Sequence, residues 1–157
     1  VTAGLGPPQR VAFLGGAELR GAAHECALKV LELTAGQVAS FWESPLGFRH
    51  GPKSLVNEQT QVIVLLSEDD NAHCYDADVV DELRRQYAPQ QVFTVGTQCT
   101  GADLTFRDIA RGWNIPLYVL PAQLLAVAWS RKLGLNVDNP FPEGNLSRVV
   151  QGVRLYP

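Results

Sequence analysis

Methionine is absent from this sequence of 157 residues, and cysteine is scarce. The three cysteines (Cys26, Cys74 and Cys99) are an odd number, and no two of them form a C-x-x-C pair. This usage argues against a disulfide framework and is typical of a protein kept in a reducing compartment. We therefore expect a cytoplasmic location.

Long apolar runs and an excess of positive charge are also missing. No uninterrupted apolar run approaches the roughly 18 residues that cross a bilayer, so we expect no membrane partner. The chain does not open with a basic segment followed by an apolar one, and we expect no retained secretory signal. Sixteen acidic residues against thirteen basic ones give a formal net charge of −3, which argues against nucleic-acid binding.

The apolar content is that of an ordinary globular domain. Apolar residues make up 46% of the chain, and a domain of this length buries roughly 70% of the surface that its unfolded chain exposes. The first nine residues are rich in glycine and proline, which is typical of a linker. Together with the missing initial methionine, this leader suggests the C-terminal piece of a longer protein.

Apolar strands alternate with helices along the chain. Continuous apolar runs predict strands at residues 10–14, 37–42, 61–66, 91–95 and 115–120. Helical spacing predicts helices at 17–34, 76–87 and 121–133 and a short helix from residue 51, with a loop at 43–50 and an irregular segment at 96–112. We expect an open three-layer α/β/α sandwich with a parallel sheet of about five strands. Ligands of such sheets bind at the carboxyl ends of the strands.

The polar face of the first predicted helix is one candidate site. At 100° per residue, Glu25, Lys29 and Glu32 lie within about 60° of one another, opposite the apolar face. One interpretation is a solvated helix face with an ion pair at i,i+4 spacing. The other makes one of the glutamates a base for proton transfer.

The loop at residues 44–53 is a second candidate. It places His50 between Arg49 and Lys53, beside a helix start at Pro52 whose free N–H groups can hold an anion. Imidazole titrates near neutral pH, so it can exchange protons with a sugar hydroxyl or ring oxygen. The alternative is a surface histidine in a turn rich in glycine and proline.

Other familiar site patterns find little support. His73, Cys74 and Asp76 are a weak suggestion of a metal site, and we expect no metal. The glycines at 15, 16 and 21 do not fit G-x-G-x-x-G, and the chain contains neither a G-x-S-x-G elbow nor a P-loop.

Three stretches, in this order, resemble the sugar isomerase (SIS) family of phosphosugar enzymes. They run from Glu25 to Gly36, from Ser44 to Leu55, and through the tail segments Asn136 to Pro140 and Asn145 to Gly152. The resemblance covers nearly the whole chain from about residue 10. It implies an SIS domain at residues 10–142, preceded by a leader at 1–9 and followed by an extended tail at 143–157 that contributes to the site.

The resemblance implies an aldose–ketose isomerase that can also deaminate an amino sugar. The expected substrate is a hexose or hexosamine 6-phosphate of the galactosamine-6-phosphate or tagatose-6-phosphate type. Glu32 matches the carboxylate that moves a proton between C1 and C2. His50 matches the histidine that opens the sugar ring and can reach the site of a neighbouring subunit. Arg148 stands where related enzymes have a tail lysine.

The same resemblance sets further expectations for partners and binding residues. The phosphate-binding loop of these enzymes, rich in Ser and Thr, is not evident, so we expect a preceding SIS domain. The resemblance and the apolar helices together also predict a homo-oligomer. A histidine and a carboxylate suffice for the reaction, so no cofactor is expected. A sugar-phosphate sensor without catalysis, or a dimerising scaffold, remains an alternative. The residues expected to bind substrate are Glu25, Ser44, Arg49 and Lys53.

Overall fold

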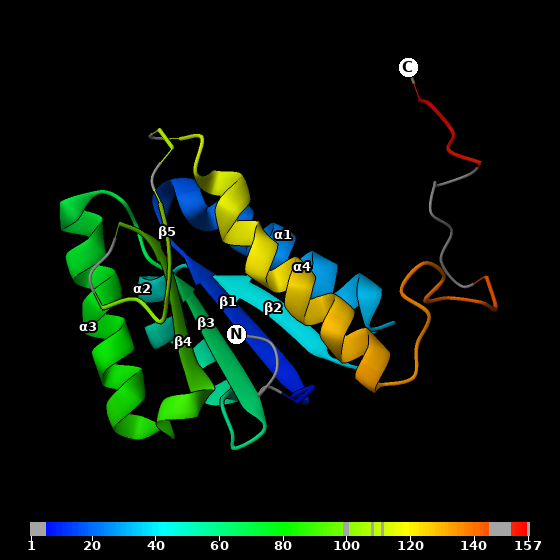
Figure 1. The fold of residues 1–157 in the computed structure, drawn as a ribbon, viewed down its shortest axis with the longest axis horizontal. Helices are drawn as coiled ribbons and strands as arrows, with labels where there is room; N and C mark the ends of the chain where they lie inside the picture. Colours follow the sequence, from blue (N-terminus) through cyan, green and yellow to red (C-terminus); the bar gives the residue numbers. More distant parts are fainter. Residues whose placement is uncertain (1–5, 99–100, 108, 111, 145–151, 157) are drawn as a thin grey trace.

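Five parallel strands form one sheet in the part of the chain that the computed structural model describes, which is residues 6–98, 101–107, 109–110, 112–144 and 152–156 (Figure 1). The strand order is β2-β1-β3-β4-β5. The two central strands, β1 and β3, are almost completely buried, as their continuous apolar runs require. The strand bounds are β1 Arg10–Gly15, β2 Ala39–Glu43, β3 Thr60–Leu65, β4 Val92–Thr97 and β5 Leu104–Phe106.

Helices cover both faces of the sheet, which confirms the predicted three-layer α/β/α sandwich. On one face, α1 (Arg20–Leu33) and α4 (Ile115–Lys132) pack over side chains such as Val11 and Phe13. On the other face, α2 (Pro45–Arg49) and α3 (Asp70–Gln86) pack over the alternate side chains, such as Ala12. The short 3-10 helices are η1 Ala17–Leu19, η2 Pro52–Leu55 and η3 Pro89–Gln91.

The predicted fifth strand at 115–120 is wrong, because this run forms the first turns of α4. Buried residues of α4 recur every three or four positions, which is the period of a helix (Tyr118, Ala122, Leu125, Ala126 and Trp129). The exposed positions between them include Leu120 and Leu124, so the sequence looks uniformly apolar. The fifth strand is instead β5, a three-residue edge strand inside the segment expected to be irregular.

Two shorter corrections concern the layer that holds α2 and α3. The predicted loop at 43–50 contains α2, whose N-terminus is capped by the Ser44 side chain accepting from the Gly47 N–H at 3.1 Å. Helix α3 begins at Asp70 rather than at residue 76, because Asp69 accepts from the Ala72 N–H and caps an earlier first turn.

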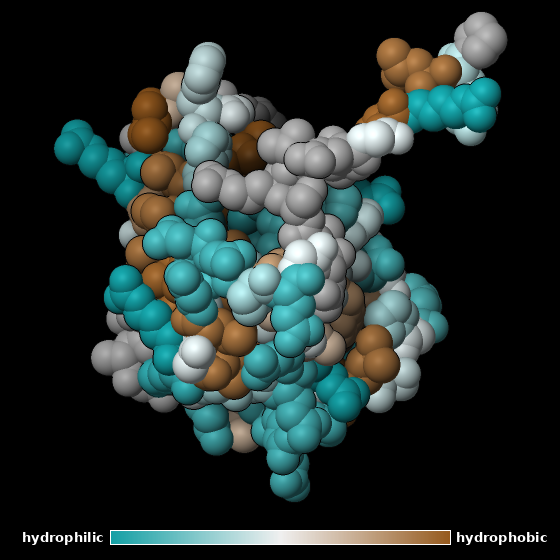
Figure 2. Space-filling view, turned by 90° about the vertical axis from the view of Figure 1, so that its right-hand side faces the viewer, coloured by the Kyte–Doolittle hydropathy of each residue, from teal (hydrophilic) through white to brown (hydrophobic). Residues whose placement is uncertain are grey.

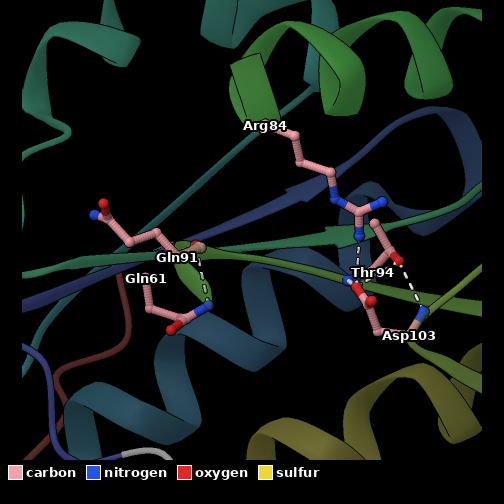
Figure 3. Close-up of polar contacts among 5 residues, drawn as sticks. All are labelled: Gln61, Arg84, Gln91, Thr94 and Asp103. Carbon is pink, nitrogen blue, oxygen red and sulfur yellow. Dashed lines mark hydrogen bonds and ion pairs between the residues drawn. The ribbon is translucent and has the colours of Figure 1, made fainter. Parts of the chain in front are cut away.

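Asp103 anchors the edge of the sheet at β5 (Figure 3). Its Oδ2 atom accepts from the backbone N–H of Thr94 at 2.8 Å and from the Thr94 hydroxyl at 2.9 Å. The same atom pairs with the guanidinium of Arg84 on α3 at 2.7 Å. At the amino ends of β3 and β4, Gln61 Nε2 donates to the carbonyl of Gln91 at 3.0 Å (Figure 3). These contacts tie β4 and the residues that flank it to α3, β3 and β5.

The remaining domain predictions concern the ends of the chain. Residues 152–156 are exposed and lie away from the sheet (Figure 1). The role of the tail at 143–157 in a site, and the leader at 1–9, therefore stay predictions. Within the described ranges, no helix combines the length and the apolar character that crossing a membrane requires.

Candidate functional site

The polar face of α1 brings Glu25, Lys29 and Glu32 together. Lys29 Nζ donates to Glu32 Oε2 at 2.7 Å and lies 3.5 Å from Glu25 Oε1. The hydrogen bond to Glu32 is the main cause that raises the pKa of Lys29 above its ordinary value. The lysine therefore stays charged at neutral pH and holds two carboxylates at spacings i,i+3 and i−4. Glu32 is half-buried, with 37% of its side chain exposed, so a ligand can reach it.

His50 lies between two short helices in the opposite layer. It follows the last residue of α2, and its backbone N–H donates to the carbonyl of Gly47 at 3.1 Å. Phe48, two residues earlier, is fully buried in the core beneath α2. The imidazole itself is exposed. The backbone is thus anchored to the core while the ring remains accessible to a ligand.

The two cations beside His50 share one carboxylate, that of Glu82 on α3. Arg49 donates to Glu82 Oε2 from Nε at 2.7 Å and lies 2.6 Å from it through a terminal nitrogen. Lys53 donates to Glu82 Oε1. These hydrogen bonds, that of Lys53 first, lower the pKa of Glu82. Sequence reasoning missed Glu82, because it lies 33 positions beyond Arg49 and only the packing of α3 on α2 brings it there.

The sheet separates the two residues expected to carry proton transfer. Glu32 lies on α1, which packs in the core shared with α4, whereas His50 follows α2, whose Phe48 packs in the core shared with α3. The contacts described within one chain therefore do not bring Glu32 and His50 into one site. Arg148, the third predicted catalytic residue, lies outside the described residues.

The carboxyl edge of the sheet holds an acidic hollow that sequence reasoning did not name. After β1 the chain adds β2 on one side of it and then β3 on the other side, so the order of the strands switches between β1 and β3. Sheets of this topology bind ligands at such a switch point. A cavity of about 210 Å³ lies there, and it is lined by Glu18, Leu19, Glu68, Gly112 and Ile115. Glu68 Oε1 accepts from Thr97 Oγ1 at 2.8 Å and from Asn114 Nδ2 at 2.7 Å. Two carboxylates in this hollow, those of Glu18 and Glu68, would repel a phosphate.

Asp76, part of the weak metal suggestion, has a structural role instead. It is 3% exposed, and its Oδ2 atom accepts from the Ser67 backbone N–H at 2.9 Å. Burial raises the pKa of Asp76, and the hydrogen bonds from Ser67 partly offset this rise. His73 Nδ1 lies 3.3 Å from the Ser67 carbonyl, whereas Cys74 is exposed. No group of three or more His, Cys, Asp or Glu side chains is arranged to hold a metal ion among the described residues.

Curated relatives match almost the whole of this chain. It is 46% identical over 151 residues to a D-galactosamine-6-phosphate deaminase (AgaS) of Shewanella sp. strain ANA-3, covering 96% of this chain and 38% of the relative. It is 39% identical over 165 residues to the enzyme of that name from Escherichia coli, covering 98% of this chain and 42% of the relative. The chain thus spans about two fifths of the length of these relatives. No protein-family model matches it.

A solved structure shares both the fold and the sequence similarity. The crystal structure of tagatose-6-phosphate ketose/aldose isomerase from Escherichia coli superposes with a TM-score of 0.77 at 35% sequence identity. The match covers 98% of this chain and 41% of that one. Structure and sequence therefore point to the same group of proteins.

Proposed function

Because this chain is related in sequence and in fold to the phosphosugar isomerases and deaminases of the sugar isomerase family, we propose that it is part of such an enzyme. Its proposed substrate is a hexose or hexosamine 6-phosphate of the galactosamine-6-phosphate or tagatose-6-phosphate type. The observation that carries the proposal is the 46% identity to a D-galactosamine-6-phosphate deaminase across 96% of the chain. The unpaired thiols of Cys26 and Cys74 support a cytoplasmic location for this enzyme.

Proton transfer requires a base beside the sugar carbons C1 and C2. Glu32 is proposed for this role, because it is accessible and its carboxylate is oriented by the hydrogen bond from Lys29. The base removes the proton from C2 and returns it at C1 through an enediol, or through an enolamine when C2 carries an amino group. In the second case, protonation at C1 leaves a ketimine at C2. Water adds to this ketimine and ammonia leaves, so deamination shares its first steps with isomerisation.

Ring opening must come before these steps, and His50 is proposed to catalyse it. A histidine imidazole can deliver a proton to the ring oxygen and accept one from the C1 hydroxyl. Because the sheet separates His50 from Glu32 within one chain, the proposed site takes its histidine from a neighbouring subunit. This arrangement requires a homo-oligomer.

Apolar side chains on the outer faces of α1 and α4 support such an assembly. Leu28 and Leu31 on α1 and Leu120 and Leu124 on α4 are between 36% and 54% exposed. In the view that faces the right-hand side of the fold, apolar side chains reach the surface among polar ones (Figure 2). Helix α4 is apolar around most of its circumference, and such a helix is normally covered on both sides. The proposed covers are a preceding SIS domain, which would also bind the phosphate, and a second subunit.

The test uses the full-length protein and a panel of hexose and hexosamine 6-phosphates. Ketose formation and ammonia release are measured separately, so isomerisation and deamination are distinguished. The proposal predicts turnover of at least one galacto-configured substrate. Saturable binding of these sugars without any turnover would contradict it and would support a sugar-phosphate sensor instead.

A further inference from the structure

We propose that Glu82 is a positioning residue for the His50 turn, here defined as residues 49–53. In this role it fixes the imidazole for ring opening by holding the cations on both sides of it. The inference rests on the proposed function, which makes His50 the ring-opening residue. Glu82 lies on α3, outside every stretch of the sequence that carries the resemblance to the SIS family.

The geometry singles out Glu82 because its two carboxylate oxygens are used separately. Oε2 receives Arg49, which precedes His50, and Oε1 receives Lys53, which follows it. The carboxylate thereby closes a bridge around the turn. Only 17% of the Glu82 side chain is exposed, against 35% for Arg49 and 24% for Lys53, so solvent screens these pairs less than ordinary surface pairs.

Without this bridge, the chain after α2 has few anchors near the histidine. Phe48 fixes the segment before the turn by full burial in the core. Beyond the turn, Arg10 donates to the carbonyl of Leu55 at 3.1 Å. Between these two points, the described backbone hydrogen bonds are local, such as Ser54 N–H to Gly51 O at 2.9 Å. Among the described hydrogen bonds and ion pairs of residues 49–53, those with Glu82 are therefore the ones that tie the turn to α3.

Ring opening depends on this placement more strongly than later steps do. The imidazole must lie within hydrogen-bonding distance of both the ring oxygen and the C1 hydroxyl, and a displacement of about 1 Å can cost a large factor in rate. Proton transfer between C1 and C2 uses a base on α1, in the other layer of the sandwich. Loosening the turn should therefore slow a cyclic substrate and spare one that cannot cyclise.

The experiment compares Glu82→Gln with Asp81→Asn in the full-length protein. Glutamine keeps the shape of glutamate but removes the charge that binds both cations. Asp81 is the exposed neighbour on the same helix, so its variant controls for loss of one negative charge from α3. Two readouts are used: hydrogen exchange of the amides in residues 49–56, and kcat/KM for a cyclic hexose 6-phosphate and for an open-chain ketose phosphate lacking the ring-closing hydroxyl.

We expect Glu82→Gln to speed exchange in residues 49–56 by about tenfold, as local opening becomes easier. It should also lower kcat/KM for the cyclic substrate by about tenfold and change the open-chain value less than about twofold. Asp81→Asn should leave both readouts near those of the unmodified protein.

Each failure has a distinct meaning. Unchanged exchange in Glu82→Gln would show that the carboxylate does not hold the turn, whatever the activity. Faster exchange with equal losses on both substrates would leave Glu82 a structural residue only and overturn the positioning role. A full-length protein that turns over no sugar phosphate would instead overturn the proposed function, and the catalytic part of this inference with it.

Discussion

Lys29 donates to Glu32 across one turn of α1, with 2.7 Å between Nζ and Oε2. The same ammonium lies 3.5 Å from Glu25, so one cation holds two carboxylates on the polar face of the helix. A solvated helix face would show this ion pairing, and so would a catalytic carboxylate that must keep one orientation. Substitutions at Glu32 distinguish the two.

Glu32→Gln should preserve folding and ligand binding but lower kcat by roughly a hundredfold or more, which is the scale of a general base. The loss should be equal for cyclic and open-chain substrates, because both need the proton moved between C1 and C2. Steady-state kinetics on the full-length protein provides the measurement, with the exposed Glu58→Gln as a control. Near-normal turnover in Glu32→Gln would remove this residue from the mechanism.

His50→Ala should instead discriminate between the two substrates. A cyclic hexose 6-phosphate needs its ring opened before the chemistry at C1 and C2, so its kcat/KM should fall far more than that of an open-chain analogue. The ratio of the two kcat/KM values, compared between His50→Ala and the unmodified protein, is the measured quantity. Equal losses on both substrates would assign the histidine to binding or to proton transfer.

Leu124→Glu should weaken subunit or domain association through the outer face of α4. Leu124 is 54% exposed in the isolated chain, and burying such a side chain is worth about 1.5–3 kcal/mol. Loss of that contribution, together with burial of a charge, should raise the dissociation constant at least about tenfold. Sedimentation velocity of the full-length protein measures this, and Gln123→Glu on the same helix is the matched control. An unchanged sedimentation profile would place the interface elsewhere.

Asp76→Asn should change the pH dependence of stability. Burial raises the pKa of Asp76 in the folded state above its ordinary value of 3.8, so the folded protein binds this proton more tightly than the unfolded chain. The unmodified protein therefore loses stability as pH rises through the raised pKa, and asparagine does not carry this cost. Asparagine can still accept the hydrogen bond from the Ser67 N–H.

The measured quantity for Asp76 is the Tm of each protein between pH 4 and pH 7. The difference, variant minus unmodified protein, should increase with pH. A difference that stays constant or falls across this range would contradict the buried, ionised carboxylate. Asp76→Leu offers a contrast, because it leaves the Ser67 N–H without its acceptor and should cost about 1–3 kcal/mol.

The thiol of Cys26 should be inert in the native protein, whereas that of Cys74 should react. Burial raises the pKa of Cys26 to about 12, so almost none of it is thiolate at pH 8. Cys74 is exposed. In a Cys99→Ser background, a chromogenic disulfide reagent should modify one thiol quickly and the second only after denaturant is added. Prompt modification of a protein that lacks both Cys74 and Cys99 would contradict the buried position of Cys26.

Several features could be predicted from local sequence, because their cause is local. Continuous apolar runs identify β1 and β3, since a strand buried on both faces is apolar along most of its length. The polar face of α1 follows from the 3.6-residue period, and that period alone brings Lys29 to Glu32. The run at 115–120 was predicted to be a strand because α4 is apolar on its outer face as well, which hides its helical period.

Tertiary packing decided the rest. The pairing of Glu82 with Arg49 and Lys53 depends on α3 lying against α2, and no local pattern encodes a contact across 29 or 33 positions. Likewise, the order of the strands, and not their sequences, places Glu32 and His50 in opposite layers. The sequence by itself determined which residue types are available and which helix face or turn carries them. Only the folded chain decided which of them meet, because charges and hydrogen-bonding groups act over a few ångströms of space, however far apart they lie along the chain.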